Sequence, residues 1–159
     1  MQLSGTPPQA GDAAPDFSLT QGDLSKVTLA DSAGKIRIIS VVPSIDTGVC
    51  AIQTKRFNEA VDSLPDSVVF YTVSVDTPFA QKRWCGAEGV EKLTMLSDYK
   101  GGAFGRDWGL YIAEPLGTHA RAVFVVDGDG KIAYAELVPE ITQEPDYESA
   151  LAAAKALVG

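Results

Sequence analysis

Two long apolar runs, Ile36–Val42 (IRIISVV) and Val68–Val75 (VVFYTVSV), restrict the possible folds of this chain more than any other feature. Runs of this length that are rich in Val and Ile predict buried strands. The segment between them, from about Thr47 to Ser63, has apolar residues at roughly helical spacing. A buried strand, a helix and another buried strand therefore form the centre of the predicted fold.

The remainder of the chain continues this alternation. We expect short strands at Phe17–Thr20, Val27–Leu29 and Lys92–Ser97, short helices at Pro78–Trp84 and Ala103–Trp108, and a last helix at Asp146–Leu157. Two more strands, Ala122–Val126 and Lys131–Leu137, flank the sequence DGDG, and Asp-Gly between apolar runs is a strong hairpin signal. The pattern predicts an α/β fold with a mixed central sheet and helices on both faces, as a single domain over residues 1–159.

Composition narrows the functional classes. The chain has 159 residues, of which 45% are apolar, and this is enough for one domain with a substantial core. Its formal charge of −8 argues against nucleic acid or an anionic membrane as the main partner, because both attract clustered positive charge. The beginning, MQLSGTPPQAGDAAPDF, shows no basic patch followed by an apolar stretch, and no apolar run reaches the length of a membrane span. We expect a soluble, cytoplasmic protein.

The two cysteines, Cys50 and Cys85, need an explanation in a reducing compartment, where structural disulfides are rare. They are too far apart in sequence for a Cys-x-x-Cys redox motif. A tetrahedral zinc site would need both cysteines, the one histidine, His119, and a carboxylate, none at short spacing, so no metal is expected. Two alternatives remain, a pair of inert core thiols or a reactive pair.

The position of Cys50 favours a reactive thiol. Pro43 ends the strand, Asp46 or Thr47 can cap the helix, and Cys50 then lies in its first turn. Free N–H groups and the positive end of the helix dipole favour a thiolate there. The dipole supplies at most about 2 kcal/mol, so we expect a nearby cation as well. Cys50 is expected about 100° round the helix from Val49 and so off the buried stripe, which is made of Val49, Ile52, Phe57, Ala60 and Leu64.

Four stretches of the sequence, in the same order, indicate a family. Pro43, Thr47 and Cys50 fit the Pro-x-x-x-Thr-x-x-Cys motif of the peroxiredoxins. The strings PSIDTGVC and PFAQKRWCGAEG (Pro78–Gly89) closely resemble the thiol peroxidase subfamily of atypical two-cysteine peroxiredoxins. RAVFVVD, which begins at Arg121, and EITQEPDYESAL, which begins at Glu140, resemble the same subfamily. The resemblance runs from about Gln9 to the C-terminus.

The resemblance implies a role for five residues. Cys50 matches the peroxidatic cysteine that attacks the peroxide and becomes a sulfenic acid, and Cys85 matches the resolving cysteine that joins it in an intramolecular disulfide. Thr47 matches the hydroxyl that binds the thiolate and the peroxide oxygen. Pro43 matches the proline that shields the pocket, and Arg121 matches the active-site arginine, which would be the expected cation.

The resemblance also implies the wider properties of the protein. The expected fold is thioredoxin-like, and the expected enzyme is a peroxidase that acts on hydrogen peroxide and organic hydroperoxides without a metal or organic cofactor. Thioredoxin is the expected reductant, and a homodimer is the expected assembly. The family's N-terminal β-hairpin would be shortened, because only MQLSGTPPQ precedes AGDAAPDF. We further expect an ordinary pKa of about 8.5 for Cys85, and a Cys50 pocket that is open to peroxide.

Two rival functions remain at this point. A cysteine hydrolase could use Cys50 with His119 as its base, although His119 is expected in a loop. That reading leaves Cys85 and the Pro43–Thr47 pattern without a purpose. A peroxide-sensing thiol protein that relays its disulfide to a partner shares the first chemical step with the peroxidase.

Overall fold

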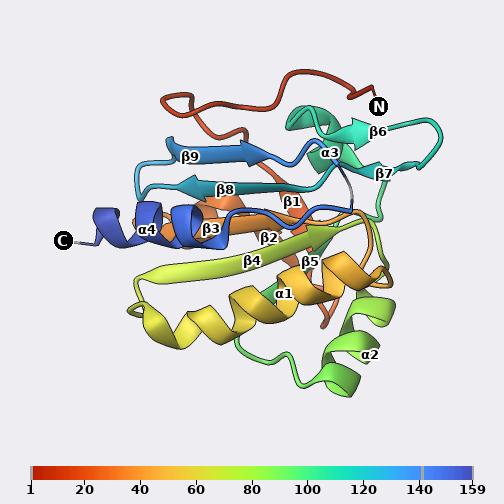
Figure 1. Ribbon diagram of the computed structural model, residues 1–159, viewed down its shortest axis with the longest axis horizontal. Helices are drawn as coiled ribbons and strands as arrows, with labels where there is room; N and C mark the ends of the chain where they lie inside the picture. Colours follow the sequence, from red (N-terminus) through yellow and green to blue (C-terminus); the bar gives the residue numbers. More distant parts are fainter. Residues whose placement is uncertain (1, 141, 159) are drawn as a thin grey trace.

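The computed structural model describes residues 2–140 and 142–158, and in them seven strands form one twisted sheet (Figure 1). From edge to edge the strands are β2 (Lys26–Thr28), β1 (Ser18–Thr20), β5 (Thr94–Ser97), β4 (Val68–Ser74), β3 (Ile36–Val41), β8 (Ala122–Val126) and β9 (Ile132–Leu137). Met1, Gly159 and Ile141, the last of which belongs to the string EITQEPDYESAL, lie outside the described residues.

The sheet is mixed, as the sequence predicts. Strand β4 pairs in parallel with both β3 and β5, while β8 runs antiparallel to β3 and to β9. Each parallel connection contains a helix, because a parallel crossover needs a long return path. Helix α1 (Gly48–Ala60) connects β3 to β4, and helix α2 (Pro78–Glu88) connects β4 to β5. The β8–β9 hairpin turns at the DGDG sequence, where the Asp127 N–H donates to the Lys131 carbonyl.

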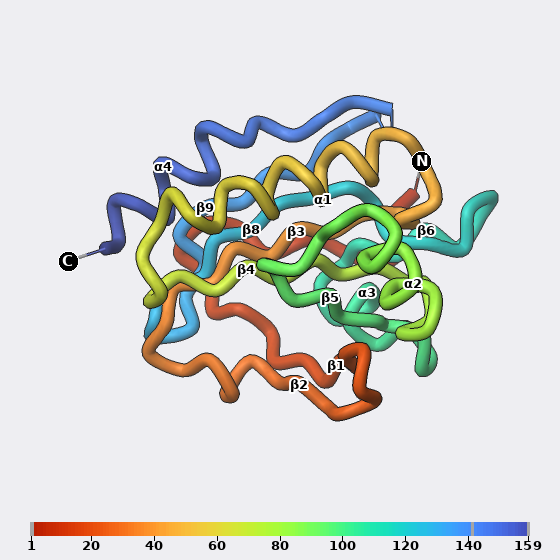
Figure 2. The backbone as a smooth tube through the Cα atoms, turned by 90° about the horizontal axis from the view of Figure 1, so that it is seen from below, coloured from red at the N-terminus to blue at the C-terminus, as the bar shows by residue number. Residues whose placement is uncertain are grey.

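Apolar side chains cover both faces of the sheet. On one face, Phe57 of α1 and Ala150 and Ala154 of α4 (Tyr147–Leu157) pack in one buried cluster, and Figure 2 shows α1 and α4 along the same side. On the other face, α3 (Ala103–Asp107) contributes Phe104 to a second cluster. The short pair β6 (Tyr111–Ile112) and β7 (Thr118–His119) adjoins it, and the 3-10 turns η1 (Leu29–Ser32) and η2 (Val61–Ser63) complete the described elements.

The predicted elements are confirmed within a few residues, with two differences. Helix α2 does not end at Trp84 but continues to Glu88, so Cys85 lies inside the helix. The helix ends at Gly89, whose φ of 70° is the left-handed conformation that glycine adopts without strain. The strands β6 and β7 were not predicted, because each has only two residues and shows no periodicity.

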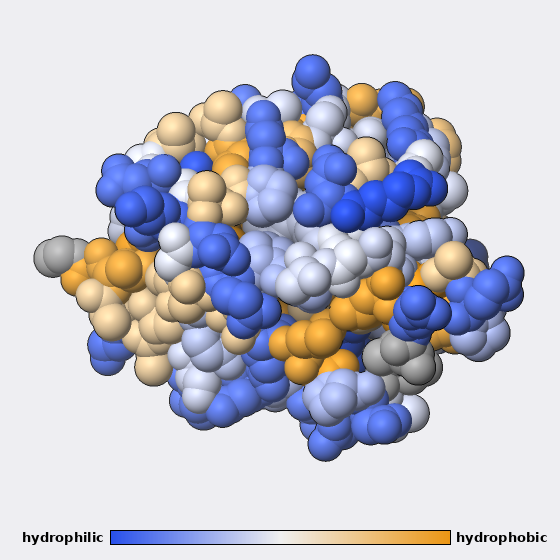
Figure 3. Space-filling model, turned by 90° about the horizontal axis from the view of Figure 1, so that it is seen from above, coloured by the Kyte–Doolittle hydropathy of each residue, from blue (hydrophilic) through white to orange (hydrophobic). Residues whose placement is uncertain are grey.

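Among the described residues, no helix is both long enough and apolar enough to cross a bilayer. The face seen in Figure 3 is mixed, with hydrophilic side chains between apolar ones that gather near the C-terminal end and along the lower edge of the view.

Candidate active site

The loop between β3 and α1 brings the predicted motif together. Val42 continues the sheet for one residue, because its N–H donates to the Val73 carbonyl at 3.0 Å. Pro43 follows, is buried, and lacks the N–H needed to extend the ladder. Thr47 occupies the N-cap position with extended backbone angles, but its side chain makes no capping hydrogen bond. The Thr47 hydroxyl instead donates to the Ser44 carbonyl at 3.3 Å. Thr47 is thus the N-cap residue, as predicted, but the predicted capping bond from its side chain is wrong.

Cys50 lies in the first turn of α1, as predicted. The Ala51 N–H donates to the Thr47 carbonyl at 3.0 Å as the first bond of this helix. The N–H groups that precede it in α1 therefore have no acceptor within the helix, and they point toward its positive end. Cys50 is 0% exposed, so the expected pocket open to peroxide is wrong for this structure. Thr47, three residues earlier in the chain, is exposed.

The buried face of α1 differs from the predicted apolar stripe. Ile52 is 51% exposed, whereas Cys50, Gln53 and Thr54 are completely buried. Buried polar groups are tolerated where hydrogen bonds replace those lost to water. The Thr54 hydroxyl donates to the Cys50 carbonyl at 2.8 Å, and the Gln53 amide donates to the Ser40 hydroxyl of β3 at 2.7 Å. Cys50 is thus on the buried face, and partners on the sheet explain why polar residues accompany it.

Arg121 reaches the Cys50 helix from the adjacent strand. Val41 pairs with Ala122, so Arg121 lies beside the end of β3, where the Cys50 loop begins. Its side chain is 1% exposed, and its Nη1 donates to Gln53 Oε1 at 2.8 Å. Gln53 is three residues after Cys50 and lies on the same face of the helix. Gln53 was not predicted as a site residue, although its position one turn after the cysteine places it on the same face of the helix.

The beginning of α4 lies against the second half of α1. The Tyr147 ring meets Phe57 edge-on with centroids 5.3 Å apart, and the Arg56 guanidinium lies 5.4 Å from its centroid. Burial and a hydrogen bond to Glu144 raise the pKa of Tyr147, while Arg121 and Arg56 act in the opposite direction. The positive charge of Arg121 therefore acts on the Tyr147 hydroxyl at the start of α4. This segment lies in the string EITQEPDYESAL, to which the sequence alone assigned no role.

Cys85 is a free, half-buried thiol on α2, and Cys50 is also free. Together with Trp84, Cys85 packs at the edge of the apolar cluster that also contains Val90 and Leu93. Burial raises the pKa of the Cys85 thiol to about 11, so the expectation of an ordinary pKa is wrong. In this arrangement Cys85 is a poor nucleophile at neutral pH, because the thiolate is the reactive form.

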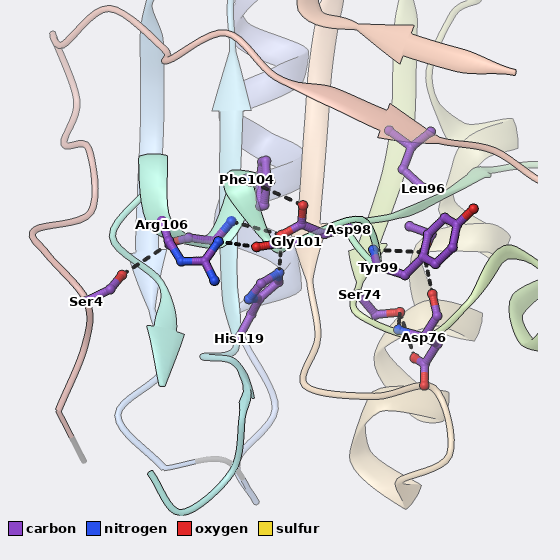
Figure 4. A network of polar contacts seen from close by, with 12 residues as sticks. Ser4, Ser74, Asp76, Leu96, Asp98, Tyr99, Gly101, Phe104, Arg106 and His119 are labelled. Carbon is purple, nitrogen blue, oxygen red and sulfur yellow. Dashed lines mark hydrogen bonds and ion pairs between the residues drawn. The ribbon is translucent and has the colours of Figure 1, made fainter. Parts of the chain in front are cut away.

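His119 belongs to a different part of the molecule. It is 0% exposed on β7, not in a loop, and its Nε2 lies 2.8 Å from Asp98 Oδ2 (Figure 4). Asp98 also accepts hydrogen bonds from the N–H groups of Phe104 and Gly105, so this pair fixes the start of α3. Gly105 is required here, because a Cβ atom would lie 2.2 Å from His119 Cε1. His119 packs against Phe104 and Tyr111, on the face of the sheet opposite α1, so its position does not support a hydrolase that uses His119 with Cys50.

Comparison with known proteins identifies the family. The Redoxin family model matches residues 9–151. The chain belongs to the Redoxin family. Within this family it is 57% identical over 157 residues to a thiol peroxidase of Streptococcus pneumoniae, covering 99% of this chain and 95% of the relative. It is 53% identical over 156 residues to the thiol peroxidase of Bacillus subtilis, covering 98% of this chain and 92% of the relative.

Solved redoxin structures agree with this assignment. The crystal structure of a peroxiredoxin-like protein from Aquifex aeolicus is 39% identical and matches with a TM-score of 0.92, over 98% of this chain and 91% of that one. A thiol peroxidase from Chromobacterium violaceum, 22% identical, matches with a TM-score of 0.87 over 96% of this chain and 89% of that one, and shows the shared fold. The resemblance to thiol peroxidases, the thioredoxin-like fold and the class of enzyme, a peroxidase, are confirmed.

Proposed function

We propose that this redoxin reduces hydrogen peroxide and organic hydroperoxides with Cys50 as the attacking thiolate. The observation that supports this proposal most is the position of Cys50 in the first turn of α1, one turn from the contact between Gln53 and Arg121. The sulfur attacks one peroxide oxygen, the O–O bond breaks, and Cys50 becomes a sulfenic acid while water or an alcohol leaves. Thr47, Arg121 and the free helix N–H groups are the donors available for the developing negative charge.

Access to Cys50 requires the loop that precedes it to open. The thiol has no exposed surface, whereas Asp46, Thr47 and Gly48, shortly before it in the chain, are exposed. Gly48 has nothing within 4 Å of a Cβ position and needs no close packing. Opening of this loop would therefore admit a small peroxide, while Pro43 beneath it stays buried and limits water.

The second step joins the two cysteines. Cys85 loses its proton and attacks the Cys50 sulfenic sulfur, which releases water and leaves an intramolecular disulfide. Burial of both thiols opposes this step in the reduced structure, so part of α2 and the first turn of α1 must loosen. A dithiol then reduces the disulfide. Thioredoxin as that dithiol, and a homodimeric state, rest on the family resemblance and belong to this proposal.

Peroxide consumption with a thioredoxin system tests the function. We expect the parent to turn over, Cys50→Ser to be inactive, and Cys85→Ser to consume about one peroxide per chain before it stops. The Cys85→Ser variant is the matched control, because it removes one thiol and keeps the proposed nucleophile. Sustained turnover by Cys50→Ser would overturn the assignment of the nucleophile, and full turnover by Cys85→Ser would overturn the assignment of the resolving thiol.

A further inference from the structure

One carboxylate lies between the two cysteine-bearing segments. Asp76 follows β4 by two residues and precedes Thr77, the N-cap of α2. Figure 4 shows its side chain facing Ser74 at the end of the strand. Its main chain is also held, because the Ser97 hydroxyl donates to the Asp76 carbonyl. The position of this carboxylate is therefore fixed by the sheet.

Asp76 holds the loop before Cys50 by two bonds. The Ser44 hydroxyl donates to Asp76 Oδ1 at 2.9 Å, and the Ile45 N–H donates to Asp76 Oδ2 at 2.9 Å. Ile45 is 1% exposed, so its N–H has little access to water as an alternative partner. These bonds anchor the segment that must open for peroxide and for disulfide formation.

Asp76 is also connected to the helix of Cys85. The Ser74 hydroxyl donates to Asp76 Oδ2 at 2.6 Å and accepts from Gln81 Nε2 at 3.1 Å. Gln81 is 1% exposed and also donates to the Leu96 carbonyl at 3.0 Å. It lies four residues before Cys85 in α2, on the same face of the helix. A single hydroxyl thus relays the position of Asp76 to the resolving helix.

We propose that Asp76 is a positioning residue that latches both cysteine segments in the reduced arrangement and sets how readily they release together. This inference rests on the proposed function, since it concerns the step in which Cys85 meets Cys50. A carboxylate accepts stronger hydrogen bonds than a neutral group, so the loop and α2 are held through the same charged centre. Release on one side leaves the other side with a weakened partner, which couples the two movements.

The latch decides between two fates of the Cys50 sulfenic acid. It condenses with Cys85 to a disulfide and water once both segments release, or it reacts with a second peroxide. In the second case the sulfur gains an oxygen, the O–O bond of that peroxide breaks, and the products are a sulfinic acid and water or an alcohol. A tighter latch keeps the two cysteines in place for longer and so increases the fraction of sulfinic acid.

Ser74→Ala tests the relay, because it removes the connection to Gln81 and leaves both loop bonds to Asp76. The matched control is Ser63→Ala in η2, directly after α1, where the hydroxyl donates to the Ala60 carbonyl. Each protein is treated with increasing hydrogen peroxide, and mass spectrometry measures the sulfinic fraction of Cys50. We expect this fraction to fall about threefold in Ser74→Ala, the effect of one lost hydrogen bond on the competing step, and to stay unchanged in Ser63→Ala. An unchanged fraction in Ser74→Ala overturns the latch.

A second measurement separates positioning from general loss of stability. Ser44→Ala changes only the loop side, and amide hydrogen exchange is followed in α2 of the reduced protein. If Ser44→Ala increases the exchange rate over that of the parent more in α2 than in α4, the result supports coupling through Asp76. Equal increases in both helices, or no increase in α2, overturn it. If the parent itself forms no Cys50–Cys85 disulfide with one equivalent of peroxide, the proposed function fails with the latch. If the parent forms it and both variants behave as the parent, only the latch fails.

Discussion

Arg121 Nη1 donates to Gln53 Oε1 at 2.8 Å, and this contact joins the residue directly before β8 to the helix that carries Cys50. The same Gln53 amide donates through Nε2 to Ser40 on β3. One side chain therefore fixes the rotation of α1 against two neighbouring strands. The orientation of Cys50, one turn earlier, depends on that rotation.

Gln53→Met is expected to impair both stability and reactivity. Methionine fills a similar volume but leaves the buried Ser40 hydroxyl and the Arg121 guanidinium each without one hydrogen bond, at a cost of about 1–3 kcal/mol for each group. We expect a free energy of unfolding lower by about 2–6 kcal/mol and a peroxide rate constant at least about tenfold lower. Urea unfolding and single-turnover kinetics measure these effects. Ile52→Met, at an exposed neighbour on the same helix, should change neither quantity, and a parent-like Gln53→Met would contradict the prediction.

Arg121→Lys is expected to lose activity although the positive charge is kept. Lysine lacks the planar fork with which arginine can hold Gln53 and a reacting oxygen at the same time. We predict at least about a tenfold lower rate constant with hydrogen peroxide, or ~1.4 kcal/mol of transition-state stabilisation. Stopped-flow kinetics would measure it. Arg56→Lys provides the control, because Arg56 forms an exposed ion pair with Glu148 at 2.7 Å, and an equal loss in both variants would count against a specific role of Arg121.

The sequence predicted the features that depend on local pattern. The run Ile36–Val42, the helix that follows Pro43 and the DGDG hairpin each contain their signal within a few residues, and the structure has all three. The first-turn position of Cys50 was predicted for the same reason. Short-range periodicity and turn chemistry are sufficient for such features.

The features that were missed depend on distant partners. Periodicity placed Ile52 inside and gave no reason to bury Gln53, because Ser40 and Arg121 become its partners only in the folded sheet. The raised pKa of Cys85 was missed for the same reason. Its sequence neighbours gave no sign of the apolar surroundings that α2 provides, and these raise its pKa to about 11. Burial is a property of the tertiary structure, and one sequence does not display it.

The raised pKa of Cys85 predicts a loss of stability in alkaline solution. The folded thiol has a pKa of about 11, while the unfolded thiol ionises near its ordinary value of about 8.5. Between these values the folded protein binds more protons than the unfolded chain, so stability is full below about pH 8.5 and falls as pH rises toward 11. The free energy of unfolding of Cys50→Ser should therefore decline more steeply from pH 8 to 10.5 than that of the Cys50→Ser/Cys85→Ser double variant. Parallel curves would show that Cys85 is not held as a buried thiol.

The disulfide should loosen the two cysteine-bearing segments without unfolding the domain. Cys50 is fully buried and Cys85 is half-buried within α2, yet a disulfide needs Cβ atoms about 3.5–4.5 Å apart. Closing a loop of about 35 residues constrains the unfolded chain by about 4 kcal/mol, and the loss of helical turns and packing offsets part of this gain. The oxidised form is therefore not expected to be much more stable than the reduced one.

Amide hydrogen exchange on both redox states tests this expectation. Exchange in Thr47–Thr54 and Pro78–Gly89 should quicken when the cysteines are bridged, because the first turn of α1 and the end of α2 lose hydrogen bonds. Gly89 already has the left-handed conformation that ends α2, so unwinding from that end needs no new strained residue. Helix α4 is the internal control, since its buried Ala150 and Ala154 pack on the sheet and are not connected to the Asp76 network. Equal exchange of the two cysteine segments in both redox states would mean that the disulfide forms without the movement that their burial requires.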